Sequence, residues 1–145
     1  MDSYIKSIQI RWADLDPNFH LRHSVYYDWG AMVRMEFLEK QGLTTALMKE
    51  LKFGPVILRE ECVFKREIHY GDAVTLDTVL VKAKKDYSRW TFRHHIVKNE
   101  ATLSAILTLE GAWINTELRK LFIPPAKAAE VFSTIPLAAD FSWMD

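Results

Sequence analysis

The sequence has little cysteine, no net charge and no long apolar run, and each absence narrows the choice of protein class. Cys62 is the only cysteine among 145 residues, so the chain cannot form an internal disulfide. No stretch approaches the roughly 18 consecutive apolar residues of a membrane-spanning helix. The first six residues have neither the basic nor the apolar segment of a signal peptide. We therefore expect a protein of the reducing cytoplasm that does not enter a membrane.

The charge balance argues against a nucleic-acid partner. The 19 basic side chains equal the 19 acidic ones in number, whereas nucleic-acid-binding domains normally carry clustered basic residues in excess. Without net charge, copies of the chain do not repel one another, which leaves self-association unopposed. The aromatic residues, by contrast, are numerous: five Trp, five Tyr and eight Phe. They indicate a large apolar surface for packing, for a ligand pocket or for a subunit interface.

The first part of the sequence predicts one strand and one enclosed helix. Ile8, Ile10 and Trp12 alternate with polar residues, as in a strand with one buried face. From residue 24 to residue 41 the apolar period becomes that of a helix, and Gly42 is a stop signal. The apolar face of this helix leaves only a thin polar stripe, which is typical of a helix enclosed on most sides.

The remaining sequence predicts four strands and a short helix. The strand-like runs cover residues 56–70, 74–81, 90–96 and 103–114. Short polar turns separate these runs, so we expect antiparallel neighbours in a four-stranded meander. Pro124-Pro125 opens an amphipathic helix over residues 126–132. No linker or repeat interrupts the chain, which predicts a single domain over residues 1–145 of the α+β class, with its sheet curled round the long helix.

Two carboxylates and two imidazoles, Asp14, Asp16, His20 and His23, fall within ten residues between the first strand and the long helix. The first N–H groups of a helix lack internal partners and lie at the positive end of its dipole. They can therefore bind an oxyanion or polarise a carbonyl group. A carboxylate held opposite them could act as a nucleophile or as the base that activates water.

The pattern from Asp14 to Tyr26 resembles the signature of the 4-hydroxybenzoyl-CoA thioesterase-like branch of the hotdog superfamily. Members of this family read aromatic–x–Asp–x–Asp, then a loop that is often Gly-His-Val-Asn-Asn, then small–x–Tyr at the start of the central helix. By this resemblance Asp16 falls on the catalytic Asp, and Tyr26 on the helix Tyr ten residues later. His20 falls on the His of the loop, and His23 on a position at the helix start where members carry His or Asn.

The sequence departs from the family pattern at two positions. Phe19 stands where Gly is common, and Arg22 stands where the family has Asn. A phenylalanine lacks the easy access of glycine to positive φ and would place its ring beside the expected pocket. Both departures bear on the shape of the loop and on the range of substrates.

The resemblance implies a hotdog fold, in which a curved antiparallel sheet of about five strands wraps around one long central helix. It implies hydrolysis of acyl-CoA to a free acid and coenzyme A, with Asp16 as nucleophile or general base. His23 is the second expected catalytic residue, because its backbone N–H or its ring would polarise the thioester carbonyl. A thiolate of the cysteine type, with a pKa of about 8.5, leaves without a strong general acid, so no metal or cofactor is expected. The expected substrate-binding residues are His20, Arg22, Ser24 and Tyr26.

The family also predicts the state of assembly. Hotdog proteins usually pair into dimers with a continuous sheet, and some form tetramers. We therefore expect a homodimer or homotetramer in which part of each site comes from a partner chain.

Several of these residues also have structural explanations. Asp16-Pro17-Asn18 is a common turn sequence, Asp14 is expected to bond to Arg11 or to the backbone, and Ser24 is expected to cap the helix. A metal site made of the two carboxylates and two imidazoles does not match a recognised ligand spacing. A set of basic residues around one predicted hairpin could hold the phosphates of coenzyme A or could simply be solvated; its members are Lys82, Lys84, Lys85, Arg89 and Arg93.

Two other functions remain open at this point. Phe19 and Arg22 motivate a non-catalytic hotdog domain that binds acyl-CoA or senses a ligand, and such a domain would bind without releasing free thiol. A more distant alternative is a small α+β cone unrelated to the hotdog fold. The position of the helix after the first strand disfavours it, because such a cone usually begins with its helices.

Overall fold

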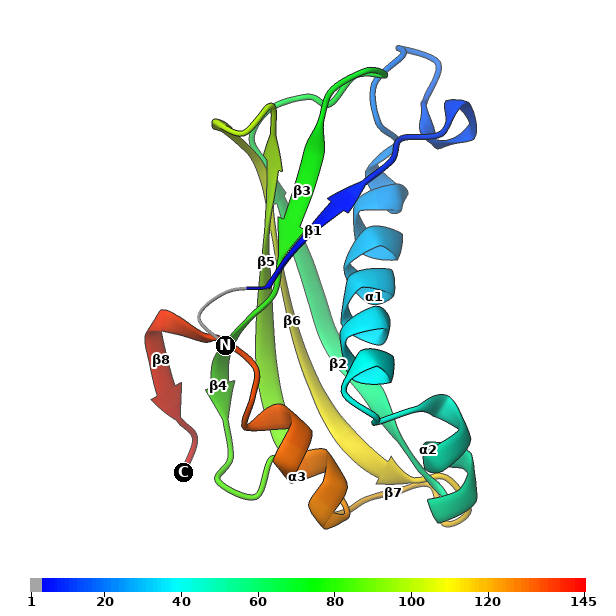
Figure 1. Cartoon of the computed structure of the whole chain (residues 1–145), viewed down its shortest axis with the longest axis vertical. Coiled ribbons are helices and arrows are strands. Elements are labelled where there is room, and N and C mark those ends of the chain that lie inside the picture. Colours follow the sequence, from blue (N-terminus) through cyan, green and yellow to red (C-terminus); the bar gives the residue numbers. More distant parts are fainter. Residues whose placement is uncertain (1–3) are drawn as a thin grey trace.

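The computed structural model describes residues 4–145, which form a curved sheet with a long helix along its concave side (Figure 1). The helices are η1 (Trp12–Asp14, a 3-10 helix), α1 (His23–Lys40), α2 (Thr45–Leu51) and α3 (Ala126–Phe132). The strands are β1 (Ile5–Ile8), β2 (Phe53–Phe64), β3 (Val74–Asp77), β4 (Val79–Ala83), β5 (Arg89–Lys98), β6 (Thr102–Asn115), β7 (Lys120–Leu121) and β8 (Leu137–Trp143).

The sheet is antiparallel through its whole centre. Strand β5 pairs with β3 and β4 along one edge and with β6 along the other. Strand β2 extends the sheet beyond β6, and β1 extends it beyond β3. The predicted α+β architecture, a curved antiparallel sheet around one central helix, is therefore confirmed.

The predicted meander is wrong at its first step. Strand β2 pairs with β6 rather than with β3, its neighbour in sequence. Residues 65–73 carry the chain across the end of the sheet instead of turning back beside β2. Ile68, at the middle of this crossing segment, is fully buried, and its carbonyl accepts a hydrogen bond from the Leu21 N–H at 2.7 Å. Burial of Ile68 thus fixes a crossing that local turn residues did not reveal.

The first strand is shorter than predicted. It ends at Ile8, and Trp12 begins η1 with its side chain 71% exposed. The carboxylate of Asp14 accepts a hydrogen bond from the backbone N–H of Arg11 at 2.9 Å, which turns the chain out of the extended conformation. The alternation of apolar residues continues to Trp12, but the strand itself ends at Ile8.

Helix α1 is less enclosed than its wide apolar face predicted. Seven of its residues are buried, whereas Ala31, Met32 and Glu36 are exposed together with the predicted stripe of Asp28, Glu39 and Lys40. The helix ends as expected at Gly42, which has a φ of 90°. The Leu43 N–H bonds to the Leu38 carbonyl at 2.9 Å, and the Gly42 N–H to the Glu39 carbonyl at 3.1 Å. These two bonds satisfy the last carbonyls of the helix in a Schellman motif.

Of the shorter elements, one agrees with the sequence-based prediction and three were not predicted. Helix α3 has the predicted bounds, and it buries Ala128, Val131 and Phe132. The sequence reading did not predict α2, β7 or β8, and β8 pairs with β4 in parallel. No helix within residues 4–145 combines the length and the apolar character that crossing a membrane requires.

Candidate active site

The segment before α1 is held in place by Asp14. One carboxylate oxygen, Oδ1, accepts a hydrogen bond from Arg11 Nη2 at 2.7 Å, and the other, Oδ2, accepts from the Arg11 backbone. The side-chain bond from Arg11 lowers the pKa of Asp14, so this buried carboxyl is ionised at neutral pH. The Asp14 carbonyl also accepts the Arg22 N–H at 2.8 Å. The prediction that Asp14 has a structural role through Arg11 is confirmed.

Asp16 lies in the loop that follows. Its Oδ1 accepts hydrogen bonds from the backbone N–H of Asn18 at 2.8 Å and of His20 at 3.2 Å. Its own backbone N–H donates to the His20 carbonyl at 2.8 Å. Within residues 4–145, the second oxygen, Oδ2, accepts no hydrogen bond. One half of this carboxylate therefore shapes the turn, and the other half remains available to a substrate.

Phe19 adopts the positive φ that its residue type disfavours. Its φ is 65°, in the left-handed region where the family often has Gly. The ring is 65% exposed and does not line the cavity beside Asp16, so the expectation of a ring against the pocket is wrong. The left-handed backbone lets the loop keep its shape and leaves the side chain in solvent.

Four of the six predicted site residues surround one hollow. A cavity of about 270 Å³, the Asp16 hollow, lies beside the start of α1. Its lining includes Asp16, His20, His23 and Tyr26, together with Leu21 and residues 64–67. Arg22 and Ser24, which were also predicted to bind substrate, do not line it.

The wall opposite α1 was missed by the sequence reading. It consists of Phe64 at the end of β2 and the charged residues Lys65, Arg66 and Glu67. These residues were placed inside the predicted strand over residues 56–70. Their consecutive charges were the only local sign that the strand ends before them. Their position beside the loop depends on the crossing segment, which the sequence did not predict.

The start of α1 has N–H groups without a partner among residues 4–145. The N-cap is Arg22, whose side chain makes no capping bond, so the prediction that Ser24 caps the helix is wrong. The backbone N–H groups of His23 and Ser24 donate no hydrogen bond to any described residue. The first turn of the helix contains no acidic residue to neutralise the positive end of the dipole. Of these two residues His23 lines the hollow, so its N–H is the candidate donor to a carbonyl oxygen or an anion there.

Tyr26 contributes a protonated hydroxyl to the hollow. Its ring is buried and lies edge-to-face against Phe64, with centroids 4.9 Å apart. Burial, followed by the nearby groups Cys62, Asp16 and Glu67, raises the pKa of Tyr26 to about 12. The hydroxyl thus stays neutral and can donate a hydrogen bond.

His20 belongs to a cluster with two residues from the crossing segment. Its Nε2 lies 3.2 Å from Glu67 Oε2, and its ring is 5.1 Å from that of His69. One ligand atom from each of His20, Glu67 and His69 lies within 4.8 Å of the others. This set differs from the one weighed in the sequence, in which Asp14 is already bound by Arg11. The expectation that no metal is needed stays a prediction.

The basic hairpin does not approach the Asp16 hollow within one chain. Lys84 and Lys85 lie in the turn between β4 and β5, at the opposite end of the sheet from the start of α1 (Figure 1). Arg93 is held by Asp140 through two hydrogen bonds of 3.0 and 3.1 Å. Any contact of this hairpin with the same substrate would require another chain.

The curved antiparallel sheet around one helix, with a polar hollow at the helix start, defines a hotdog-fold protein. A family model described as the thioesterase-like superfamily matches residues 10–132, and the chain belongs to this superfamily. No curated protein is detectably similar to it in sequence.

Solved structures show the same fold at low sequence identity. A hypothetical protein from Staphylococcus aureus in complex with CoA is 17% identical, with a TM-score of 0.87 over 99% of this chain and 90% of that one. DHNA-CoA thioesterase from the same organism is 20% identical, with a TM-score of 0.81 over 92% and 90% of the two chains. The 1,4-dihydroxy-2-naphthoyl-CoA thioesterase from Synechocystis is 16% identical, with a TM-score of 0.82 over 91% and 96%. At such identities the similarity establishes the fold.

Proposed function

We propose that this protein is an acyl-CoA thioesterase, which hydrolyses a thioester to a carboxylic acid and coenzyme A with Asp16 as its reacting carboxylate. One observation carries the proposal: Asp16, with its free Oδ2, and His23, with its unpaired backbone N–H, border the same hollow. Membership of the thioesterase-like superfamily supports it. Two structural neighbours that are CoA thioesterases, and the CoA bound to a third, support it as well.

The chemistry requires only groups in the hollow and in the first turn of α1 beside it. The thioester carbonyl oxygen accepts hydrogen bonds from the N–H groups of His23 and Ser24, which stabilise the negative charge that develops on it. As a nucleophile, Asp16 attacks the carbonyl carbon, the C–S bond breaks, and water then hydrolyses the acyl-aspartyl anhydride. As a general base, Asp16 instead takes a proton from water, whose oxygen attacks the same carbon. In both cases coenzyme A leaves as a thiolate that needs no strong acid.

The other predicted site residues take supporting roles in this proposal. His20 and Tyr26 line the hollow and orient the substrate, Tyr26 through its neutral hydroxyl. Ser24 contributes its backbone N–H, and the Arg22 side chain contacts the coenzyme A part outside the hollow. Arg22 and Ser24 thus bind substrate without belonging to the hollow itself.

The proposal includes a homodimer, or a tetramer of such dimers, formed through β2. Within residues 4–145, β2 pairs only with β6, so its other edge is open to another strand. Leu58 and Val63 on β2 are 49% and 46% exposed, which is unusual for large apolar side chains in a sheet. Covering this edge with a second copy would bury both, and it would bring a partner chain close to α1.

A cytoplasmic location completes the proposal. It rests on the single thiol, Cys62, because one cysteine cannot form the internal disulfides that small proteins of oxidising compartments often carry.

The first prediction tests Asp16 directly. Replacing Asp16 by Asn or Ala should lower the turnover of acyl-CoA by about 100-fold or more, since both changes remove the reacting carboxylate. Release of free thiol from short, long and aromatic acyl-CoA substrates measures the effect. Asp28→Asn, which removes an exposed acid from α1 outside the hollow, should leave turnover unchanged. Undiminished turnover in folded Asp16→Asn protein would refute the assignment.

A non-catalytic acyl-CoA-binding or ligand-sensing domain is the second candidate. The two backbone hydrogen bonds to Asp16 Oδ1 favour it, because they are what a turn-forming aspartate makes. This candidate predicts saturable binding of acyl-CoA with no thiol release by the unmodified protein. The same assay, combined with a binding titration, separates the two.

A further inference from the structure

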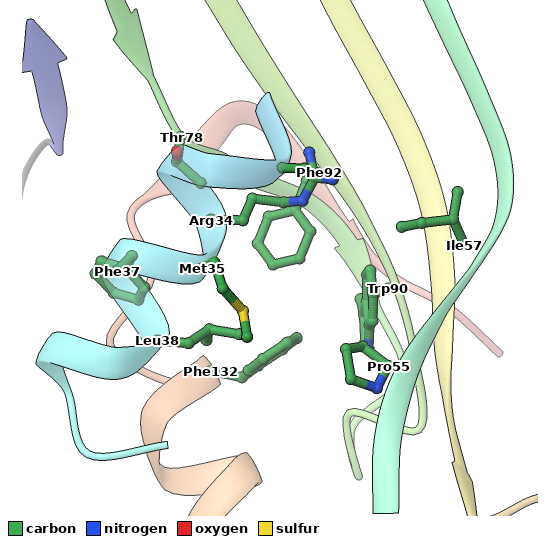
Figure 2. A pocket seen from close by; sticks show the side chains of 11 residues that line it. Arg34, Met35, Phe37, Leu38, Pro55, Ile57, Thr78, Trp90, Phe92 and Phe132 are labelled. Atoms are coloured by element: carbon green, nitrogen blue, oxygen red, sulfur yellow. The ribbon is translucent and has the colours of Figure 1, made fainter. Parts of the chain in front are cut away.

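Side chains that commonly bind metal ions gather at the rim of the Asp16 hollow. Figure 2 shows a second cavity, between the middle of α1 and the sheet, whose lining contains no His, Cys, Asp or Glu. At the Asp16 hollow, by contrast, His20, Glu67 and His69 form one group, the His20 cluster. His20 and Glu67 also line the hollow, whereas His69 does not. The cluster therefore borders the hollow and extends beyond it.

The backbone holds the two histidines of the His20 cluster side by side. His20 and His69 form an isolated antiparallel bridge, next to the hydrogen bond of 2.7 Å from the Leu21 N–H to the Ile68 carbonyl. Ile68 is fully buried, so this contact between the loop and the crossing segment is anchored in the core. The His69 N–H donates to Asp72 Oδ2 at 2.8 Å, which fixes the other side of the crossing segment. The fold thus brings two imidazoles together through backbone contacts.

Both imidazole rings approach the same oxygen of Glu67. His20 Nε2 lies 3.2 Å from Glu67 Oε2, and His69 Nε2 lies 3.7 Å from it. Two ligand atoms at about 2.0–2.1 Å from a tetrahedral zinc ion are about 3.3 Å apart, so both distances are close to an edge of that tetrahedron. The Nδ1 atom of His69 lies 3.9 Å from Asp72 Oδ2, and carboxylates in such positions commonly orient metal-binding imidazoles.

No lysine or arginine neutralises the carboxylate of Glu67. Among residues 4–145, its ion-pair partners are the two imidazoles alone. The Lys98 ammonium donates to the backbone carbonyl of Glu67 and not to its carboxylate. The side chains of Glu67 and His69 are 62% and 51% exposed, so both can rotate onto an ion without repacking the core. The cluster therefore offers a cation two nitrogens and one negative charge.

We propose that His20, Glu67 and His69 bind one Zn²⁺ ion, which joins the loop wall of the Asp16 hollow to the wall made by the crossing segment. Two imidazole nitrogens and one carboxylate oxygen are a ligand set that zinc uses. Mg²⁺ and Ca²⁺ prefer oxygen ligands, which makes them poor occupants of this site. Three protein ligands leave a fourth position for water or for an anionic group of a bound molecule.

An ion held by His20 would restrain the loop that carries Asp16. The N–H of His20 donates to Asp16 Oδ1 at 3.2 Å, and its carbonyl accepts the Asp16 N–H at 2.8 Å. Fixing the His20 ring to the crossing segment therefore also limits the motion of the Asp16 turn. The ion takes no part in the proposed hydrolysis, so this inference stands whether or not the protein is a thioesterase.

Calorimetric titration of the metal-free full chain with zinc chloride tests the site. The unmodified protein should bind one Zn²⁺ per chain, and the same titration with magnesium chloride should show no binding. His69→Gln should weaken zinc binding by about tenfold or more, since loss of even an outer partner of a metal site often costs that much. The half-exposed His69 ring is not needed for the backbone bonds of the crossing segment, so this variant should fold.

Two further variants sharpen the comparison. Glu67→Gln keeps both rings but removes the charge, and it should also weaken zinc binding. His95→Gln is the matched control, because it removes an imidazole that bonds to Asp77 Oδ2 at 2.8 Å, outside the cluster. It should bind Zn²⁺ as the unmodified protein does. No saturable zinc binding, equally tight binding of Mg²⁺, or unchanged zinc affinity of His69→Gln and Glu67→Gln would overturn the proposal.

Hydrogen exchange then locates the ion without any activity measurement. Saturating Zn²⁺ should slow exchange of the amides of residues 18–21 and 67–69 in the unmodified protein, because the ion stabilises only conformations in which both walls are in place. His69→Gln at the same zinc concentration should show no such slowing. Zinc-dependent protection confined to other parts of the chain would place the ion elsewhere and overturn the assignment. Thiol release enters neither experiment, so failure of the thioesterase proposal remains distinguishable from failure of this one.

Discussion

At the scale of single residues, two neighbouring carboxylates have different tasks because of what bonds to them. Both oxygens of Asp14 are occupied by Arg11, and its side chain is buried. Asp16 uses one oxygen to hold the turn and has the other available at the Asp16 hollow. The family resemblance had assigned different roles to the two residues by position alone. The hydrogen bonds give the physical difference: only Asp16 keeps a carboxylate oxygen without a hydrogen bond within residues 4–145.

The buried His94 predicts a dependence of stability on pH. Its pKa is lowered from 6.5 to about 4 in the folded protein, mainly by burial. Above pH 6.5 both states have neutral His94, whereas between 6.5 and 4 the unfolded chain alone gains a proton. The stabilising effect of the neutral folded form is therefore present above about 6.5 and lost as the pH falls toward 4, by about 3 kcal/mol in total.

Urea unfolding of the unmodified protein and of His94→Gln at several pH values measures this effect. The difference in unfolding free energy between the two proteins should shrink from pH 7 to pH 4.5. Parallel curves over this range would show that His94 does not titrate as its burial requires.

At the scale of elements, α1 positions the candidate active site. Its first turn contains His23, whose unpaired backbone N–H belongs to a residue that lines the Asp16 hollow. Its distance from the sheet is set where it crosses β6. A Cβ atom at Gly30 would come within 2.4 Å of Leu107 Cδ2, so only glycine permits the observed approach.

Gly30→Ala should destabilise the protein by about 1–3 kcal/mol. The overpacking against Leu107 outweighs the gain in helix propensity of about 1 kcal/mol that alanine brings. Chemical denaturation of Gly30→Ala, Leu107→Ala and the double variant forms a mutant cycle. Gly30→Ala should cost less in the Leu107→Ala background, where the clashing methyl is gone. An equal cost in both backgrounds would place the strain elsewhere.

The spacing of apolar residues predicted the elements whose formation depends on local sequence alone. Helix α1, its Gly42 stop and the short α3 follow from apolar spacing and from glycine and proline positions. The pairing of β2 with β6 does not, because β3, β4 and β5 lie between these two strands in the sequence, and the crossing segment with its buried Ile68 leads away from β2. For the same reason the loop half of the Asp16 hollow was predicted, and the half made by residues 64–67 was not.

At the scale of the whole molecule, the open edge of β2 is the main unsatisfied surface. The opposite side of the sheet is extended by β1 on β3 and by β8 on β4. Pairing of two β2 edges would continue the sheet between copies, as the hotdog family implies. That the chain is one domain over residues 1–145 stays a prediction, since residues 1–3 lie outside the described part.

Charged substitutions on β2 should weaken self-association. Leu58→Lys or Val63→Lys places a cation on the apolar edge strand and should shift the protein toward monomer in sedimentation velocity. Leu137→Lys is the matched control, because Leu137 is 57% exposed on β8, which pairs with β4 on the other side of the sheet from β2. A monomeric unmodified protein, or equal association of all variants, would contradict assembly through β2.

The Asp16 hollow takes its two walls from stretches of chain separated by about forty residues, joined only through the crossing segment. No fragment bearing one wall alone can reconstitute it, and a chain that has formed only its local helices and hairpins has no binding site. Turnover and ligand binding both depend on this hollow, so each reports the concentration of natively folded molecules and not that of partly folded ones. Either measurement would therefore give the refolding yield.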